Sequence, residues 1–306
     1  MHLGTEAITA ECAVVTLGAA AAGLGLAAAA FRHQPVTSQK LALAMGLGTL
    51  VFAAQAVNVT VLPESSAHLV GGVLLAWTLG PALGAWTMAA ILLLQAVLLG
   101  DGSLSAWGAN VLNMGLLPAG LVAGCQWALA QRGITHQRGL VLPAGVAGIA
   151  VVLAAGLIVL ETAAFRSPTE LTTWTGFASR MLSAHLWIGA LESLATLALL
   201  YALGQLSLGS QRAATWRPAL AAAVSGLGLI AIAVPFASSL PDGYEAAALA
   251  GGMDRLLSGE TSSALLSSMN EQAGLFLATA CAATCVGLIG LAAQGLQRLV
   301  TAKVRK

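Results

Sequence analysis

Apolar stretches long enough to cross a lipid bilayer recur along this chain, and they constrain its fold more than any other feature. Apolar residues make up 58% of the chain and charged residues only 8%, whereas a soluble domain carries about a quarter charged residues. A transmembrane helix needs roughly 20 consecutive, mostly apolar residues. We therefore predict an all-α polytopic membrane protein, embedded in the lipid bilayer, with about nine transmembrane helices.

The predicted spans are separated by short polar or basic segments. Their approximate bounds are 12–31, 41–61, 69–80, 82–99, 106–130, 140–160, 182–204, 218–239 and 273–296. The 69–80 span is short, so we expect it either to lie tilted in the membrane or to form a tight hairpin with the next span across Gly80-Pro81.

Basic residues cluster in alternate segments between the spans and predict the orientation of the chain. With the N-terminus outside, Arg166, Arg180 and Arg255 lie outside, and the other ten of the 13 Lys and Arg residues face the cytoplasm. Cytoplasmic loops of membrane proteins carry an excess of Lys and Arg. We therefore predict an external N-terminus, a cytoplasmic C-terminus and an odd number of spans. No basic patch typical of nucleic-acid binding is present in the sequence.

The N-terminus offers a set of metal ligands. Met1-His2 places the α-amine of Met1, the backbone amide of His2 and the His2 imidazole within two residues, where they can close two fused chelate rings around one ion. A flat nitrogen site of this kind suits Ni(II) and Cu(II). His68 is the best candidate for the fourth corner. We expect Met1 to be retained, because the residue after it is large. The alternative is that His2 is an ordinary residue of a frayed terminus.

Two external polar segments interrupt the apolar pattern. Pro63–Gly72 places His68 at the outer end of a helix. Gly100–Gly115 continues into the next span with Asn110 and Asn113, which lie on one helical face. A buried amide costs free energy unless it is paired. These two side chains are therefore expected to bond between helices, to orient a ligating imidazole, or to contact a substrate directly.

One later span carries two ionisable residues. His185 and Glu192 lie two turns apart on one face of that span. An intramembrane carboxylate is by default a functional or paired residue. The two residues therefore either form a buried structural pair or relay a metal towards the cytoplasm. Asp242 and Glu245 lie in an external segment, where turn formation explains Asp242 without a ligand role and capture of metal from outside is the alternative.

Three of these segments together resemble a known family. Met1-His2, Ser66–Gly72 and Gly100–Gly115, which reads GDGSLSAWGANVLNMG, are similar to the CbiM/NikM family. Members of that family are the substrate-specific membrane components of cobalt and nickel transporters of the energy-coupling factor (ECF) type. The resemblance covers roughly residues 1–205.

A match and a departure qualify this resemblance. The family has a later span with a His and a Glu seven residues apart, and His185 and Glu192 match it. After Met-His the family continues with an apolar residue and then Pro-Asp-Gly, whereas Leu3–Glu6 reads LGTE here. The Pro and the Asp are absent, so the conformation of the N-terminal loop is left open.

The C-terminal part resembles a second component of the same systems. Pro241–Glu245 reads PDGYE and is similar to the Pro-Asp-Gly-Leu-Glu signature of the small two-span CbiN/NikN partner, which is fused to the larger component in some systems. The implied organisation is a CbiM/NikM-like part over 1–205, a cytoplasmic linker over 206–217 and a CbiN/NikN-like part over 218–306. Seven spans plus two would give an odd total, as the charges require.

The resemblance implies the substrate-binding component of an ECF-type ABC importer for Ni(II) or Co(II), in the plasma membrane of a prokaryote. The ion is then cargo rather than a tightly bound cofactor, and cobalt import would serve cobalamin biosynthesis. No enzymatic activity is implied, and a membrane coupling (T) protein and cytoplasmic ATPase subunits are the implied partners. The implied metal ligands are Met1, His2 and His68, with Asn110 and Asn113 as orienting residues and His185 and Glu192 as weaker candidates.

The first span offers a docking surface for such a partner. Ala19, Gly23 and Ala27 form a ridge of small residues, whose alternative use is packing within the bundle.

Two other classes of function make different demands on the sequence. A self-contained secondary transporter of a divalent metal or other small solute would need ion-coupling residues at mid-membrane, and Glu192 is the well-centred carboxylate. An intramembrane serine protease would need a nucleophile beside a base. Ser183 precedes His185 by two residues, a spacing that points the side chains apart on a helix.

Overall fold

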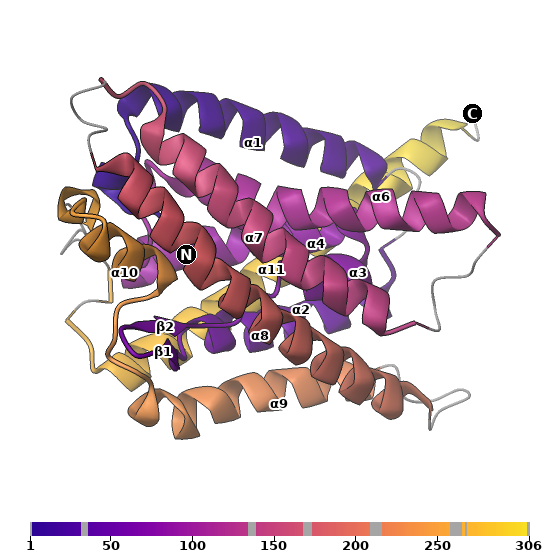
Figure 1. Ribbon diagram of the computed structural model, residues 1–306. Coiled ribbons are helices and arrows are strands. Elements are labelled where there is room, and N and C mark those ends of the chain that lie inside the picture. The colour runs from indigo at the N-terminus through magenta and orange to yellow at the C-terminus, as the bar shows by residue number, and fades with distance from the viewer. Residues whose placement is uncertain are drawn as a thin grey trace.

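The computed structural model is a bundle of helices with one short β-hairpin (Figure 1). It describes residues 2–31, 36–133, 139–167, 173–208, 216–257, 265–266 and 268–304. Met1, expected to be a metal ligand, and most of the expected linker, residues 209–215, lie outside the described residues.

The helices account for most of the described chain. In order they are α1 (Ala10–Ala30), α2 (Ser38–Gln55), α3 (Gly72–Leu79), α4 (Pro81–Leu94), α5 (Trp107–Val111), α6 (Leu117–Gln131), α7 (Val141–Ala163), α8 (Trp174–Leu208), α9 (Trp216–Ile232), α10 (Gly243–Ala250) and α11 (Glu271–Val304). Shorter turns flank them: η1 (Thr5–Ala7), the π-helical η2 (Gln95–Leu99) and η3 (Leu112–Leu116), η6 (Val234–Phe236) and η7 (Asp254–Leu257).

Six helical segments of the described chain are long and apolar enough to cross a membrane, so the protein is a multi-pass membrane protein. They are Ala10–Ala30, Pro81–Leu99, Trp107–Gln131, Val141–Ala163, Trp174–Leu206 and Glu271–Gly295. Each predicted span overlaps a helix, but α2, α3 and α9 are not among the six. The total of nine spans and the orientation therefore stay predictions.

The α3 helix cannot cross a bilayer alone. Its eight residues rise about 12 Å, whereas the hydrocarbon core is roughly 30 Å thick. It forms the tight hairpin with α4 that was one of the two expectations. Gly80 makes the turn at φ +86°, and a Cβ at Gly84 would lie 2.5 Å from the Cα of Ala76. This close approach packs α3 against α4.

The prediction of an all-α chain was wrong for one segment. The second helix ends at Gln55, and part of the predicted 41–61 span forms β1 (Val59–Leu62) instead. This strand pairs antiparallel with β2 (Ser65–Ala67). Branched residues at 57, 59, 60 and 61 favour an extended strand over a helix. The hairpin places His68 directly after β2.

The predicted 218–239 span was also too long. The α9 helix ends at Ile232, and a tight turn over Val234–Phe236 follows it. Pro235 lacks the backbone N–H that would continue the helix. The helix therefore ends earlier than the apolar pattern suggested.

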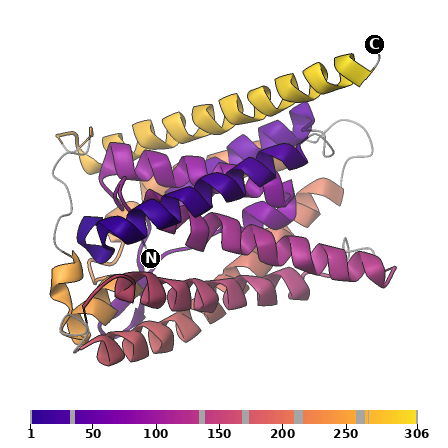
Figure 2. The same cartoon turned by 90° about the horizontal axis from the view of Figure 1, so that it is seen from above.

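The bundle has two distinct ends. The N-terminal segment, the β-hairpin and α10 gather at one end, and the ends of α6 and α11 lie at the other (Figures 1 and 2). The α9 helix packs against α2 closely enough that a Cβ at Gly226 would lie 2.8 Å from the Thr49 carbonyl oxygen. The C-terminal part of the chain is thus packed into the same bundle as the N-terminal part.

The small-residue ridge of α1 packs partly inside the bundle. A Cβ at Gly23 would lie 2.6 Å from the Cδ1 of Leu116 in η3. Ala27 is half-buried, and only Ala19 of the three is exposed. The ridge as a whole is therefore not a free docking surface.

Candidate metal centre

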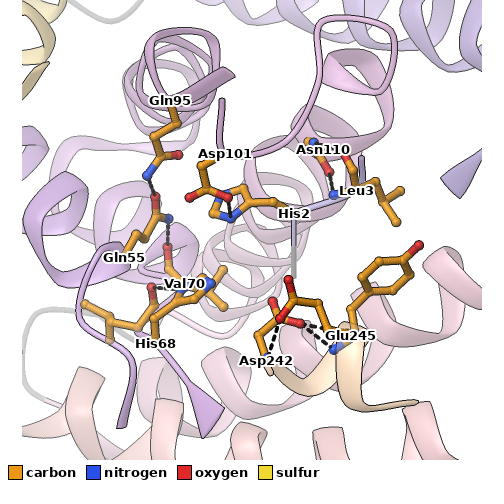
Figure 3. Close-up of polar contacts among 12 residues, drawn as sticks. His2, Leu3, Gln55, His68, Val70, Gln95, Asp101, Asn110, Asp242 and Glu245 are labelled. Carbon is orange, nitrogen blue, oxygen red and sulfur yellow. Dashed lines mark hydrogen bonds and ion pairs between the residues drawn. The ribbon is translucent and has the colours of Figure 1, made fainter. Parts of the chain in front are cut away.

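The two histidines that the sequence singled out lie side by side at the hairpin end of the bundle (Figure 3). The rings of His2 and His68 are stacked, with centroids 5.3 Å apart and an interplanar angle of 17°. His68 Nδ1 lies 3.0 Å from the Leu69 carbonyl oxygen. Because a carbonyl only accepts, Nδ1 carries the proton and the Nε2 lone pair is available to a metal.

Asp101 contacts the Nδ1 edge of the His2 ring. Its Oδ1 lies 3.0 Å from His2 Nδ1, and only 6% of the His2 side chain is exposed. Gly100 and Gly102 flank Asp101 with φ of +73° and +77°, a conformation that favours glycine. Partial burial opposes the charged form of Asp101, but the adjacent His2 ring holds the pKa of this carboxyl below its ordinary value.

A second carboxylate reaches the centre from the far end of the sequence. Asp242 caps the N-terminus of α10 in a capping box with Glu245, and with His68 it lines a small pocket. Burial opposes its charged form, but nearby positive charge and the N–H of Glu245 hold the pKa of Asp242 below its ordinary value. Two ionised carboxylates therefore flank the histidines at neutral pH.

The segment before α10 is bonded to the hairpin that carries His68. Ser66 donates its backbone N–H to the Pro241 carbonyl at 2.8 Å and its hydroxyl to the Leu240 carbonyl at 2.7 Å. Sequence reasoning placed Asp242 in an external turn and did not bring it to His68. The PDGYE motif was the only signal, and it carries no information about what it contacts.

Of the two asparagines, only Asn110 contacts the N-terminal segment. Its Oδ1 accepts the Leu3 N–H at 2.9 Å and its Nδ2 donates to the Leu3 carbonyl at 3.3 Å. Asn113 donates to Glu161 of α7 at 2.7 Å instead. The expected orienting role therefore fits Asn110, which fixes the residue after His2, whereas Asn113 makes a bond between helices.

Glu192 acts on the His68 segment through the backbone. Its two carboxylate oxygens accept the N–H groups of Val70 and Gly71, each at 2.8 Å. Glu192 and His68 also line one cavity of about 240 Å³. The carboxylate is thus occupied by the peptide that follows His68.

His185 is buried and faces α10. Its Nδ1 lies 2.7 Å from the Met181 carbonyl oxygen, and within the described chain its Nε2 has no hydrogen-bond partner. A Cβ at Gly243 would lie 2.9 Å from His185 Cε1. The residues of the expected pair therefore face different elements.

The side chains of the described residues do not complete a metal site by themselves. Among them no group of three or more His, Cys, Asp and Glu is arranged to hold a metal ion. The centre instead offers two imidazoles beside two carboxylates, so further donors would have to come from the backbone. The sequence analysis missed the positions of Asp101 and Asp242.

Comparison with known proteins finds a matching protein family and several relatives. Residues 2–208 match the family CbiM, described as the cobalt uptake substrate-specific transmembrane region. A protein of Archaeoglobus fulgidus that carries the name fused nickel transport protein NikMN is 38% identical over 95 residues, which are 31% of this chain and 32% of that protein. The fused nickel transport protein NikMN of Rhodobacter capsulatus is 33% identical over 124 residues, which are 40% of this chain and 35% of that protein.

The matched regions are short relative to the relatives. The chain spans about a third of the length of these two relatives, 32% and 35%. Two solved structures share the fold: a truncated transition metal transporter (TM-score 0.56, 24% identity, 67% of this chain and 99% of that chain) and a transition metal transporter (TM-score 0.55, 24% identity, 67% and 93%). The predicted resemblance, a CbiM/NikM-type component with a NikN-like segment fused to it, is confirmed.

Proposed function

The chain belongs to the CbiM family, and on that premise we propose that it is the substrate-binding component of an ECF-type importer for Ni(II) or Co(II). The observation that carries this proposal is the enclosed pair of imidazoles, His2 and His68, stacked 5.3 Å apart between two carboxylates. A divalent cation is the cargo that such a centre attracts, because the flanking Asp101 and Asp242 supply negative charge.

The proposed ligands are four nitrogens. The α-amine of Met1, the backbone amide of His2 and His2 Nδ1 form two fused chelate rings, and His68 Nε2 supplies the fourth donor. Only Nδ1 can close a six-membered ring with the amide nitrogen of its own residue, because Nε2 lies too far along the ring. In this structure Nδ1 faces Asp101. Loading therefore requires Nδ1 to exchange the carboxylate for the metal.

A flat four-nitrogen site favours Ni(II) and Cu(II) over Zn(II), which prefers a tetrahedron. Co(II) is accommodated by the same donors. The amine, the amide and both imidazoles must lose protons to bind, so affinity falls with acid. The work of uphill import would come from a membrane coupling protein and cytoplasmic ATPase subunits, which are proposed partners.

The test is a titration of purified protein with a native N-terminus and a C-terminal tag. Ni(II) and Co(II) are titrated by calorimetry into the wild type, His2→Ala, His68→Ala and a variant with one residue added before Met1. We expect tight one-to-one binding that all three changes abolish. Binding that survives the added residue would exclude the amine as a ligand.

A second measurement separates this proposal from a self-contained secondary transporter. Protein reconstituted alone in liposomes is assayed for uptake of Ni(II) under an imposed proton or sodium gradient. The ECF proposal expects no gradient-driven uptake without the partner proteins. Uptake by the chain alone, unaffected by His68→Ala, would favour the secondary transporter.

A further inference from the structure

Two buried glutamines lie beside the proposed metal centre, and neither has a role in the proposed function above (Figure 3). Gln55 ends α2 and Gln95 begins the π-helical turn η2, and the two residues are 2% and 1% exposed. Gln95 Nε2 donates to Gln55 Oε1 at 2.8 Å. Burying amides in a bundle costs free energy unless they are paired. A contact that only filled space would cost less free energy if apolar side chains made it, so the partners of the pair indicate its role.

One end of the pair holds the segment that carries His68. Gln55 Nε2 donates to the Val70 carbonyl oxygen at 2.8 Å, and the Val70 N–H is bonded to Glu192 at 2.8 Å. Both backbone groups of Val70 are therefore fixed by buried side chains from different helices. Val70 lies two residues after His68, so these bonds fix the backbone from which the His68 side chain extends (Figure 3).

The other end holds the segment that carries Asp101. The Gln95 carbonyl oxygen accepts the N–H of Gly100, and it also accepts the N–H of Asp101 at 3.2 Å. These two bonds close the π-helical turn, a local widening that is frequent at functional sites. The turn presents the Asp101 carboxylate to His2 Nδ1. Gln95 is thus connected by hydrogen bonds to the segment that carries His68 and to the segment that contacts His2.

We propose that Gln95 and Gln55 are positioning residues that couple the two halves of the metal centre, so that the His68 segment and the Asp101–His2 contact keep one relative placement. The side chain of Gln95 acts on His68 through Gln55 and Val70, and its main chain acts on His2 through Asp101. This inference rests on the proposed function, because it assigns the support of that same site.

The coupling predicts a specific pattern of metal affinities in single and double variants. If Gln95 acts on His68 only through Gln55, then removing the Gln95 amide has no further effect once Gln55 has lost its own. Residues that act as one chain show non-additive effects in a double-mutant cycle, whereas independent residues add. Loss of a residue that orients a metal ligand typically weakens metal affinity about tenfold or more.

The experiment uses the full chain and the variants Gln55→Met, Gln95→Met and the double variant. Methionine keeps the length of the side chain and removes its hydrogen bonds. We expect each single variant to bind Ni(II) about tenfold more weakly, and the double variant to bind no more than about twofold more weakly than Gln55→Met. The Cu(II)-loaded single variants should also show an electron paramagnetic resonance spectrum that differs from that of the wild type, whereas Cu(II)-loaded Thr87→Val should not.

The matched control is Thr87→Val. Thr87 lies on α4, the helix that leads into Gln95; its side chain is fully buried, and in the described chain its hydroxyl has no hydrogen-bond partner. The control should bind Ni(II) like the wild type. The metal-free unfolding temperature of every variant reports general damage. The double variant guards against poor folding of the single ones, because it leaves neither amide of the pair buried without its partner; only the Val70 carbonyl still lacks its donor.

The outcomes separate the two proposals. Variants that bind within about twofold of the wild type, or losses that add in the double variant, would overturn the coupling while leaving the metal site intact. A wild type that does not bind Ni(II), or binding unaffected by His68→Ala, would instead overturn the proposed function. A loss of affinity matched by Thr87→Val would show that general packing explains the effect and would also overturn the coupling.

Discussion

The imidazole of His2 stacks on the imidazole of His68 at 5.3 Å, although 65 residues of sequence separate them. Two imidazoles this close repel each other if both are protonated. Burial lowers the pKa of His68 to about 4, so this ring stays neutral at ordinary pH and keeps a lone pair for a metal. The stacked pair is therefore compatible with a cation-binding centre.

The two asparagines are expected to differ in their effect on metal affinity. Asn110→Ala removes both bonds to Leu3, so the residue after His2 is no longer fixed and Ni(II) affinity should fall about tenfold. Asn113→Ala is the matched variant, because its bond goes to Glu161. It should bind within about twofold of the wild type in the same calorimetric titration. Equal losses in the two variants would contradict the distinction.

Glu192→Gln is expected to reduce both stability and metal affinity. A glutamine keeps one acceptor for the Val70 and Gly71 N–H groups and turns its own NH₂ towards the other. Hydrogen bonds to charged groups contribute about 1.5–3 kcal/mol, so the metal-free unfolding temperature should drop. Ni(II) affinity should fall because the segment after His68 loosens.

Glu11→Gln is the control for this change, because Glu11 is exposed in the first turn of α1. It should unfold and bind Ni(II) like the wild type. Wild-type values of both quantities in Glu192→Gln would contradict the prediction.

The metal-free protein is expected to lose stability as the pH falls from about 6.5 to about 4. His68 has a pKa of about 4 in the folded state because of burial, below its ordinary value of 6.5. Between these values the unfolded chain binds more protons than the folded one, so acid favours unfolding. Unfolding temperatures measured across this range should fall less steeply in His68→Gln. Identical slopes in the two proteins would rule out this residue as the source.

Gly243→Ala is expected to displace α10 from α8. A Cβ there would lie 2.6 Å from Ile188 Cδ1 and 2.9 Å from His185 Cε1, closer than atoms can pack. Overpacking of this kind costs about 1–3 kcal/mol. Because Asp242 caps α10 beside His68, Ni(II) affinity should fall with the unfolding temperature.

Gly228→Ala serves as the control for Gly243→Ala. This glycine lies in α9, and a Cβ there meets nothing within 4 Å. Alanine is a better helix former than glycine, so the unfolding temperature should stay equal or rise. If Gly243→Ala behaves in the same way, α10 does not pack as tightly against α8 as the structure indicates.

Local patterns predicted most of the elements and failed where two rules compete. The apolar runs marked every long helix, because a helix satisfies its backbone within the membrane. The run through residue 61 is apolar as well, yet its branched residues form β1 after α2 ends at Gln55. Hydropathy measures the preference of a segment for lipid and does not distinguish an apolar helix from an apolar strand.

The sequence predicted only those parts of the site that can be recognised from neighbouring residues in the chain. Met1-His2 is a chelating dipeptide in any fold, and Asn110 was singled out as a polar residue inside an apolar run. Asp101 and Asp242 looked like ordinary turn residues. Nothing in their own neighbourhoods indicated that both would be held ionised beside His2 and His68.

The sequence by itself determined the membrane class, the positions of the long helices, the family resemblance and the two histidines. Each of these depends on composition, on short motifs or on residues near one another in the chain. Only the tertiary structure decided that His68 meets His2, that Glu192 and the Gln55–Gln95 pair hold the segment after His68, and that α10 brings Asp242 to it. Such contacts join residues far apart in sequence, and they arise because buried polar groups must find partners once the helices are packed.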